Sequence, residues 1–182
     1  MVIPDGVERV LFDDQTIRRR VDELAGHISA DYKDEDELVL VGVLKGAFIF
    51  LADLSRALTI RHHVDFIALA SYDTGATSGT VRLIMDARTP LDGRHVLIVE
   101  DILDTGHTLN YLVRNFRARN PASLRTCVLL RKKEREEVAV QADYLGFDIP
   151  NVWVVGYGLD FVDKYRTLPY IAALKRETYT RR

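Results

Sequence analysis

Apolar and polar positions along the chain fall into two alternating patterns, which predict helices and strands in turn. Ile17, Val21, Leu24 and Ile28 recur at intervals of four, three and four, which predicts an amphipathic helix over about residues 15–30. Continuous apolar runs of strand length lie at about 38–43 and 96–99. Such runs are typical of strands that are buried on both faces of a parallel sheet.

The rest of the chain continues the alternation. Further strands are expected at about 64–72, 80–85, 124–130 and 152–155, and further helices at about 48–58 and from about 105 to 120. Residues 73–79 are small and polar between glycines, which indicates a mobile loop. The pattern predicts an α/β fold, an open and mainly parallel twisted sheet flanked by helices. We find no repeat or linker, and therefore expect a single domain over residues 1–182.

Composition narrows the classes of protein that fit this pattern. The chain has 182 residues, 47% of them hydrophobic, which is enough for one core. Lys and Arg number 25 and Asp and Glu number 27, giving a net charge of −2 that argues against a dedicated nucleic-acid binder. The single cysteine, Cys127, excludes an internal disulfide. No targeting segment or membrane-spanning run is visible, so we expect a cytoplasmic protein without membrane partners.

The segment from Val96 to Leu109 carries the strongest chemical signal. It places Glu100 and Asp101 at the predicted carboxyl end of a buried strand, where ligands bind in open parallel sheets. A short turn then leads into a helix, whose first amides would form an anion site. Carboxylates accept hydrogen bonds from ribose hydroxyls and bind magnesium, so the pair of features fits a phosphorylated sugar that carries a metal-bound group.

A purely structural explanation exists for each residue of this segment. Asp104 or Thr105 would cap the helix, and the two acids would be loop residues near a helix dipole. That explanation does not account for the whole string behind a buried strand. The segment also lacks a preceding Gly-x-x-x-x-Gly-Lys-[Ser/Thr] loop, and Gly156-Tyr157-Gly158 does not continue into Gly-x-Gly-x-x-Gly, which excludes two common nucleotide-binding motifs.

The sequence of residues 99–109, VEDILDTGHTL, resembles the 5-phosphoribosyl 1-diphosphate motif of type I phosphoribosyltransferases. Residues 43–47, VLKGA, are similar to the pyrophosphate loop of the hypoxanthine-guanine branch of that family, and residues 154–160 with Tyr165-Arg166 are similar to its C-terminal signature. The resemblance covers about residues 8–175. It implies the type I phosphoribosyltransferase fold, with a core over about 36–150 and a small hood from about 1–15 and 150–182.

The resemblance also implies roles for individual residues on the sugar side. The 5′-phosphate would be bound by Asp104, Thr105, Gly106, His107 and Thr108, with His107 contributing its backbone amide. Glu100 and Asp101 would hold the ribose hydroxyls and magnesium, and Asp160 a second magnesium. Pyrophosphate would be bound by Lys45, Gly46 and Arg166, through a backbone with a cis peptide after Leu44.

On the base side, a purine needs an aromatic face and hydrogen-bonding groups at its edge. Trp153 is the only tryptophan. On composition alone, a tryptophan is expected to pack in the core, whereas the resemblance implies that Trp153 stacks on the purine. Lys132 would donate to the 6-oxo group, although Arg131 and Lys133 lie one residue away. The backbone of Val154 and the nearby Asp160 would complete the purine site.

The implied reaction is purine salvage: phosphoribosyl transfer to hypoxanthine or guanine, giving IMP or GMP and pyrophosphate, with magnesium as cofactor. Asp104 would accept the proton of purine nitrogen 7, and Ser71 and Tyr72 would flank a loop that closes over the site. We expect small-molecule substrates, no nucleic-acid partner, and a homodimer or homotetramer. Three alternatives stay open: an RNA-binding regulator with the same fold, a phosphoribosyltransferase that acts on another base, and a catalytically silent homologue.

Overall fold

A computed structural model describes residues 4–35, 37–72 and 80–180 of the chain. The predicted loop at 73–79 lies outside the described residues. The elements, in chain order, are β1 (Val7–Phe12), α1 (Asp14–Asp31), β2 (Leu38–Leu44), α2 (Phe48–Ala57), β3 (His62–Tyr72), β4 (Thr80–Met85), β5 (His95–Leu103), α3 (His107–Arg117), β6 (Ser123–Arg131), the 3-10 turn η1 (Lys133–Arg135), β7 (Tyr144–Asp148), β8 (Val154–Val155), β9 (Ile171–Leu174) and α4 (Arg176–Thr180).

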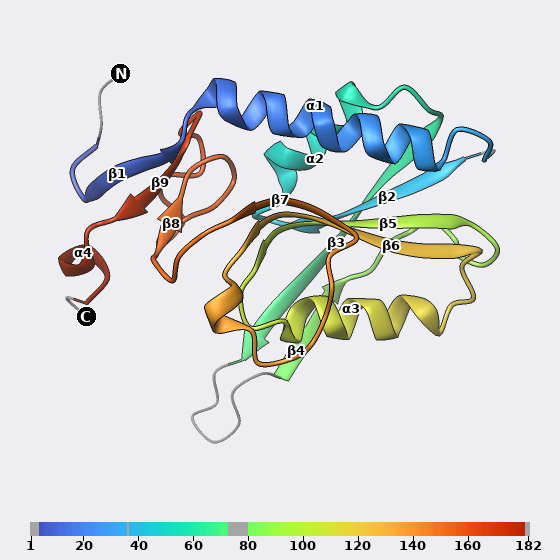
Figure 1. Cartoon of the computed structure of the whole chain (residues 1–182). Helices are drawn as coiled ribbons and strands as arrows, with labels where there is room; N and C mark the ends of the chain where they lie inside the picture. Colours follow the sequence, from blue (N-terminus) through green and yellow to red (C-terminus); the bar gives the residue numbers. More distant parts are fainter. Residues whose placement is uncertain (1–3, 36, 73–79, 181–182) are drawn as a thin grey trace.

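Six strands form the main sheet in the order β4-β3-β2-β5-β6-β7 (Figure 1). Five of them are parallel, and only β4 at the edge runs antiparallel to its neighbour. The predicted α/β fold with a mainly parallel sheet is confirmed. The carboxyl ends of β2 and β5 therefore lie side by side, which brings residues that follow Leu44 close to those around Glu100.

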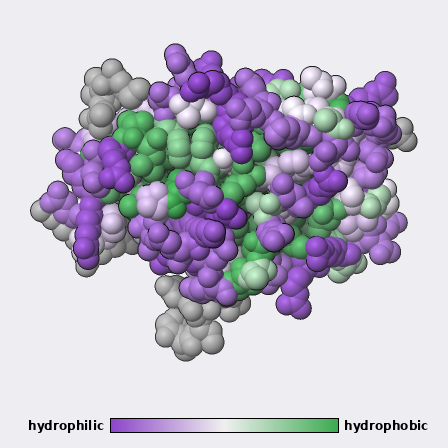
Figure 2. Space-filling view, in the orientation of Figure 1, coloured by the Kyte–Doolittle hydropathy of each residue, from purple (hydrophilic) through white to green (hydrophobic). Residues whose placement is uncertain are grey.

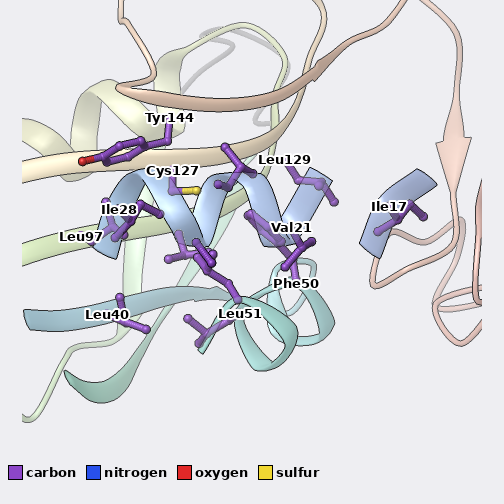
Figure 3. Packing of buried hydrophobic residues seen from close by; sticks show 14 of the residues in the cluster. Ile17, Val21, Ile28, Leu40, Phe50, Leu51, Leu97, Cys127, Leu129 and Tyr144 are labelled. Carbon is purple, nitrogen blue, oxygen red and sulfur yellow. The ribbon is translucent and has the colours of Figure 1, made fainter. Parts of the chain in front are cut away.

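Helices cover both faces of this sheet, and the alternation of side chains along each strand builds two hydrophobic layers. Leu40, Leu97 and Leu129 face α1 and α2 (Figure 3), whereas Val41 and Ile98 face α3. Helix α1 buries the predicted residues and begins where the Asp13 side chain accepts a hydrogen bond from the Thr16 amide at 2.7 Å. The apolar periodicity thus positions the elements that carry the polar turns.

A second, three-stranded antiparallel sheet has the order β1-β9-β8 and stands at one end of the main sheet (Figure 1). We call these three strands the terminal sheet. Its strands come from the two ends of the chain, and it has a small core of its own around Val155 and Tyr170. The sequence pattern missed β1 and β9, and also β7, because short strands whose partners lie far along the chain leave no periodic signal.

Strand β5 is longer than the sequence suggested. It continues through Glu100 to Leu103, because β6 runs beside it and pairs Glu100 with Val128 and Leu103 with Arg131. The two acids therefore lie within the strand rather than in the turn after it.

The face of the molecule seen in Figure 2 is largely polar. Figure 2 shows hydrophilic residues over much of the face seen in Figure 1, with hydrophobic residues in patches between them. Among the described ranges, no helix has both the length and the apolar character needed to cross a membrane.

Candidate functional site

Glu100 and Asp101 bring two carboxylates together near the end of β5. Glu100 is only 6% exposed, and its Oε2 atom is buried without a hydrogen-bond partner. Burial raises the pKa of Glu100 well above its ordinary value, and the neighbouring Asp101 charge adds to the increase. Burial also raises the pKa of Asp101. A buried carboxylate without a partner is costly, so the pair is suited to receive hydroxyl donors or a cation.

The turn between β2 and α2 lies directly against this pair. The peptide bond between Leu44 and Lys45 is cis, as the resemblance implied. A Cβ atom on Gly46 would lie 1.8 Å from Asp101 Oδ2, so only glycine allows this approach. On the other side, a Cβ atom on Gly158 would lie 2.1 Å from the Gly46 carbonyl oxygen, and Gly158 has a φ of +103°. Three segments far apart in sequence therefore meet at residue 46.

The turn from β5 into α3 leaves the start of the helix without a side-chain cap. The residue at the N-cap is Gly106, with a φ of +90°, and no side chain caps the helix. The structural explanation that Asp104 or Thr105 caps this helix is therefore wrong. The Thr105 carbonyl accepts hydrogen bonds from the amides of Glu137 and Val138, at 3.0 and 3.1 Å, which fixes the turn. Helix α3 begins with amide groups that no side chain caps, and these attract anions.

The side chain of His107 contacts a carboxylate, that of Glu137. Its Nε2 atom lies 2.9 Å from Glu137 Oε2. The imidazole is therefore engaged with a carboxylate, and only the His107 backbone is available to the predicted anion site. Thr108 follows it in the first turn of α3.

Asp104 and Lys132, assigned from separate motifs, are in direct contact. Lys132 Nζ lies 3.3 Å from Asp104 Oδ2, and Arg135 Nε donates to Asp104 Oδ1 at 2.9 Å. Lys132 is only 8% exposed, and its amide donates to the Leu103 carbonyl at 2.9 Å, which sets the register. The adjacent Arg131 is instead paired with Asp148. The lysine that lies beside Asp104 is thus Lys132.

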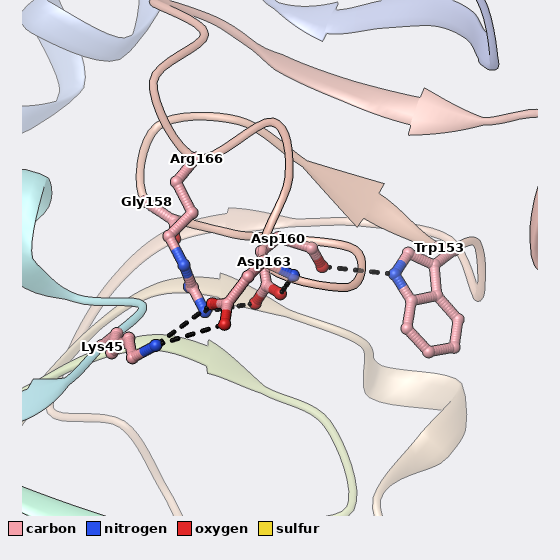
Figure 4. Close-up of polar contacts among 6 residues, drawn as sticks. All are labelled: Lys45, Trp153, Gly158, Asp160, Asp163 and Arg166. Carbon is pink, nitrogen blue, oxygen red and sulfur yellow. Dashed lines mark hydrogen bonds and ion pairs between the residues drawn. The ribbon is translucent and has the colours of Figure 1, made fainter.

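The C-terminal signature lies opposite Lys45 (Figure 4). Arg166 donates to the Gly158 carbonyl at 2.8 Å and forms an ion pair with Asp160 at 2.7 Å. Trp153 is 45% exposed, so it is not a core residue, and its Nε1 donates to the Asp160 carbonyl at 3.5 Å. Val154 is the first residue of β8 and is buried. Trp153, Val154 and Asp160 therefore lie close together, and the ring of Trp153 is exposed to solvent.

The ring of Trp153 already has aromatic neighbours. Tyr179 stacks on it with centroids 5.6 Å apart, and Phe161 meets it edge-on at 5.5 Å. Ser71 and Tyr72, the two predicted loop residues, are the last residues of β3 and pair with Val81 and Thr80 of β4. They lie within the sheet at the base of the segment that is not described.

Sequence reasoning missed three side chains that complete the site. Arg135 contacts Asp104, and Asp163 contacts both Lys45 and Arg166. The Tyr157 hydroxyl donates to Asp53 Oδ2 of α2 at 2.6 Å, which ties the C-terminal signature to that helix. Asp163 lies three residues before Arg166, and this spacing was the signal in the sequence that could have indicated their pairing. The pairing with Lys45, 118 residues away, left no trace in the sequence.

Comparisons with known proteins identify relatives along nearly the whole chain. Residues 10–162 match the model of the phosphoribosyl transferase domain. Hypoxanthine-guanine phosphoribosyltransferase of Dictyostelium discoideum is 48% identical over 174 residues, covering 93% of this chain and 97% of the relative. The enzyme of the same name from Bacillus subtilis is 41% identical, covering 95% of this chain and 96% of the relative.

Solved structures agree with the sequence relatives. A structure of Trypanosoma cruzi hypoxanthine phosphoribosyl transferase, from work on its C-terminal region, oligomeric state and activity, has a TM-score of 0.94 at 46% identity and covers 99% of this chain and 97% of its own. Another, in complex with the product IMP, has a TM-score of 0.92 at 45% identity, with coverage of 98% and 100%.

Proposed function

The chain belongs to the phosphoribosyltransferase family as a pentosyltransferase of purine salvage, and we propose that it uses magnesium and that Asp104 is its general base. The reaction transfers a phosphoribosyl group to hypoxanthine or guanine. The observation that carries the residue assignment is the contact between Asp104 and the buried Lys132 at 3.3 Å. It joins the proposed phosphate turn to the proposed base-reading residue, which supports the proposal that both substrates bind at one location.

In the proposed reaction, a purine nitrogen forms a bond to the anomeric carbon while the bond from that carbon to pyrophosphate breaks. Positive charge develops on the ribose ring, and the carboxylates of Glu100 and Asp101 would stabilise it in their buried setting. Asp104 would take the proton from purine nitrogen 7. Lys132 would donate to the 6-oxo group, and Arg135 would keep the Asp104 carboxylate oriented through its 2.9 Å hydrogen bond.

The other proposed contacts bind and orient the substrates. The amides of Gly106, His107 and Thr108, with the Thr105 and Thr108 hydroxyls, would hold the 5′-phosphate, because none of these amides is used by a side-chain cap. Lys45, Gly46 and Arg166 would bind pyrophosphate. The ring of Trp153 and the backbone of Val154 would hold the purine beside the terminal sheet. We propose that the whole site lies in a single domain. Ser71 and Tyr72 would carry the loop that excludes water.

The residues present fit a magnesium ion. Glu100 Oε2 is a buried oxygen without a hydrogen-bond partner. The neighbouring Asp101 carboxylate repels the Glu100 charge, and a cation between the two would relieve that repulsion. Within the described part of the chain, no three His, Cys, Asp or Glu side chains are close enough to hold an ion together. That agrees with an ion held by one or two carboxylates and by substrate oxygens. Glu100 and Asp101 would hold it, and Asp160 would hold a second magnesium ion. When bound, magnesium would neutralise the leaving pyrophosphate.

The test is to incubate the protein with magnesium, 5-phosphoribosyl 1-diphosphate and each base in turn, and to separate the products by chromatography. We expect IMP from hypoxanthine and GMP from guanine, no nucleotide from adenine, and loss of turnover when a chelator removes magnesium. Absence of nucleotide with every oxopurine would overturn the proposed function. A homodimer or homotetramer and a cytoplasmic location stay predictions, the first of which sedimentation velocity can check.

A further inference from the structure

Asp163 is a carboxylate at the site that the proposed reaction does not use. Its Oδ1 and Oδ2 atoms lie 3.2 and 3.3 Å from Lys45 Nζ, and its Oδ1 accepts from Arg166 at 3.0 Å (Figure 4). Lys45 and Arg166 are the two side-chain cations assigned above to pyrophosphate. One carboxylate therefore binds both groups that the diphosphate of the substrate would need.

The main chain of the segment that carries Asp163 is held independently of the Asp163 carboxylate. Tyr157, Val162, Asp163 and Tyr165 all have positive φ values, of 50°, 53°, 56° and 73°, a conformation that side-chain-bearing residues rarely adopt. The Asp163 amide also donates to Asp160 Oδ2 at 2.7 Å. The main chain is thus fixed by bonds that do not involve the Asp163 carboxylate, so the carboxylate can move without unfolding the turn.

Exposure shows which of these contacts are easily broken. The side chains of Asp163 and Lys45 are 66% and 67% exposed, and exposed ion pairs are weak. Arg166 is only 20% exposed and has Asp160 and the Gly158 carbonyl as further partners. The guanidinium is therefore held in position by contacts that do not involve Asp163.

We propose that Asp163 is a displaceable counter-ion, whose carboxylate holds Lys45 and Arg166 while the site lacks diphosphate and is replaced by the diphosphate when it binds. This inference rests on the proposed function. Binding must then break the two ion pairs, so Asp163 weakens the affinity for diphosphate and favours its release. It is a positioning residue rather than a catalytic one, since it touches the two cations and not the reacting atoms.

The experiment compares the wild-type protein with Asp163→Asn by titrating magnesium pyrophosphate in a calorimeter. Asparagine tolerates a left-handed backbone, so this substitution removes the charge without straining the turn. We expect about tenfold tighter binding, the scale of two weak ion pairs. Asp86→Asn is the control, because Asp86 also forms an ion pair with an arginine, Arg119, but away from the site. The affinity of this variant for pyrophosphate should equal that of the wild type.

A double-mutant cycle separates displacement from a general loss of negative charge. In a Lys45→Met background, Asp163→Asn should tighten binding no more than about threefold, because one of the two competed cations is gone. A gain that stays tenfold in that background, or an Asp163→Asn protein that binds no tighter than the wild type, would overturn the inference alone. A wild-type protein that does not bind magnesium pyrophosphate would overturn the proposed function and the inference with it.

Discussion

Replacing Gly46 by alanine should separate activity from stability in this protein. The added methyl group would lie 1.8 Å from Asp101 Oδ2, where ordinary contact begins at about 3.4 Å, so the carboxylate oxygen must retreat by about 1.6 Å. The atom that must move belongs to a side chain rather than to the backbone. We therefore expect the free energy of unfolding to change by less than about 1 kcal/mol, while Asp101 leaves its position beside Glu100.

The effect on catalysis follows from that displacement. A misplacement of about 1 Å at a reacting centre costs about 100-fold in rate, so kcat/KM for hypoxanthine should fall about 100-fold, equivalent to about 2.7 kcal/mol of transition-state stabilisation. The assay is initial-rate kinetics with both substrates varied, together with thermal unfolding of the same preparations.

Gly26→Ala is the matched control. Gly26 lies on the exposed side of α1, and an added methyl group there meets nothing within 4 Å. This variant should keep wild-type kinetics and gain about 0.4–1 kcal/mol of stability, because alanine restricts the unfolded chain and favours a helix. A Gly46→Ala enzyme with kcat/KM within threefold of the wild type would refute the reasoning, since the position of Asp101 would then not matter.

Three further predictions concern single side chains. Asp104→Asn should lower kcat by about 10²–10⁴-fold with little change in the KM for 5-phosphoribosyl 1-diphosphate, measured by steady-state kinetics; unchanged kcat would exclude Asp104 as the base. Lys132→Ala should raise the KM for hypoxanthine and guanine, whereas the neighbouring Lys133→Ala should not, and retained oxopurine selectivity in the first variant would show that another residue reads the 6-oxo group. Cys127 is fully buried, and burial raises the pKa of its thiol, so a thiol reagent at pH 8 should label the protein only after denaturation; stoichiometric labelling of the native protein would contradict this packing.

The sequence was most informative where the pattern was local. The apolar runs at β2 and β5 and the spacing along α1 and α3 predicted the main sheet and its helical layers, because strand and helix periods follow from side-chain direction within a few residues. The turn at Asp104 to Thr108 was also local. The end of β5 was not, because its extension through Glu100 depends on the backbone of β6.

Long-range pairings were beyond the sequence pattern. The partnership of β1 with β9, of Lys45 with Asp163 and of Asp53 with Tyr157 joins residues more than 100 positions apart. None of these pairs carries a periodic signal, and each depends on how the main chain turns, including residues with positive φ that a sequence reading assigns to glycine or asparagine. The sequence therefore indicated the groups that we propose contact substrate, but not the side chains that pair with those groups, such as Asp163 and Arg135.

The strand order of the terminal sheet has a consequence for biosynthesis. β9 is its middle strand, hydrogen-bonded to β1 on one side and β8 on the other, and it is the last of the described strands along the chain. On the ribosome, the six strands of the main sheet emerge before β9, so a nascent chain can assemble the half of the site that holds Glu100 and Asp104 first. The half that holds Trp153 and Val154 gains its neighbouring strand only after residues 171–174 have been made. The proposed purine site is therefore completed later than the proposed sugar-phosphate site, and we expect a chain that stalls before β9 to assemble the second without the first.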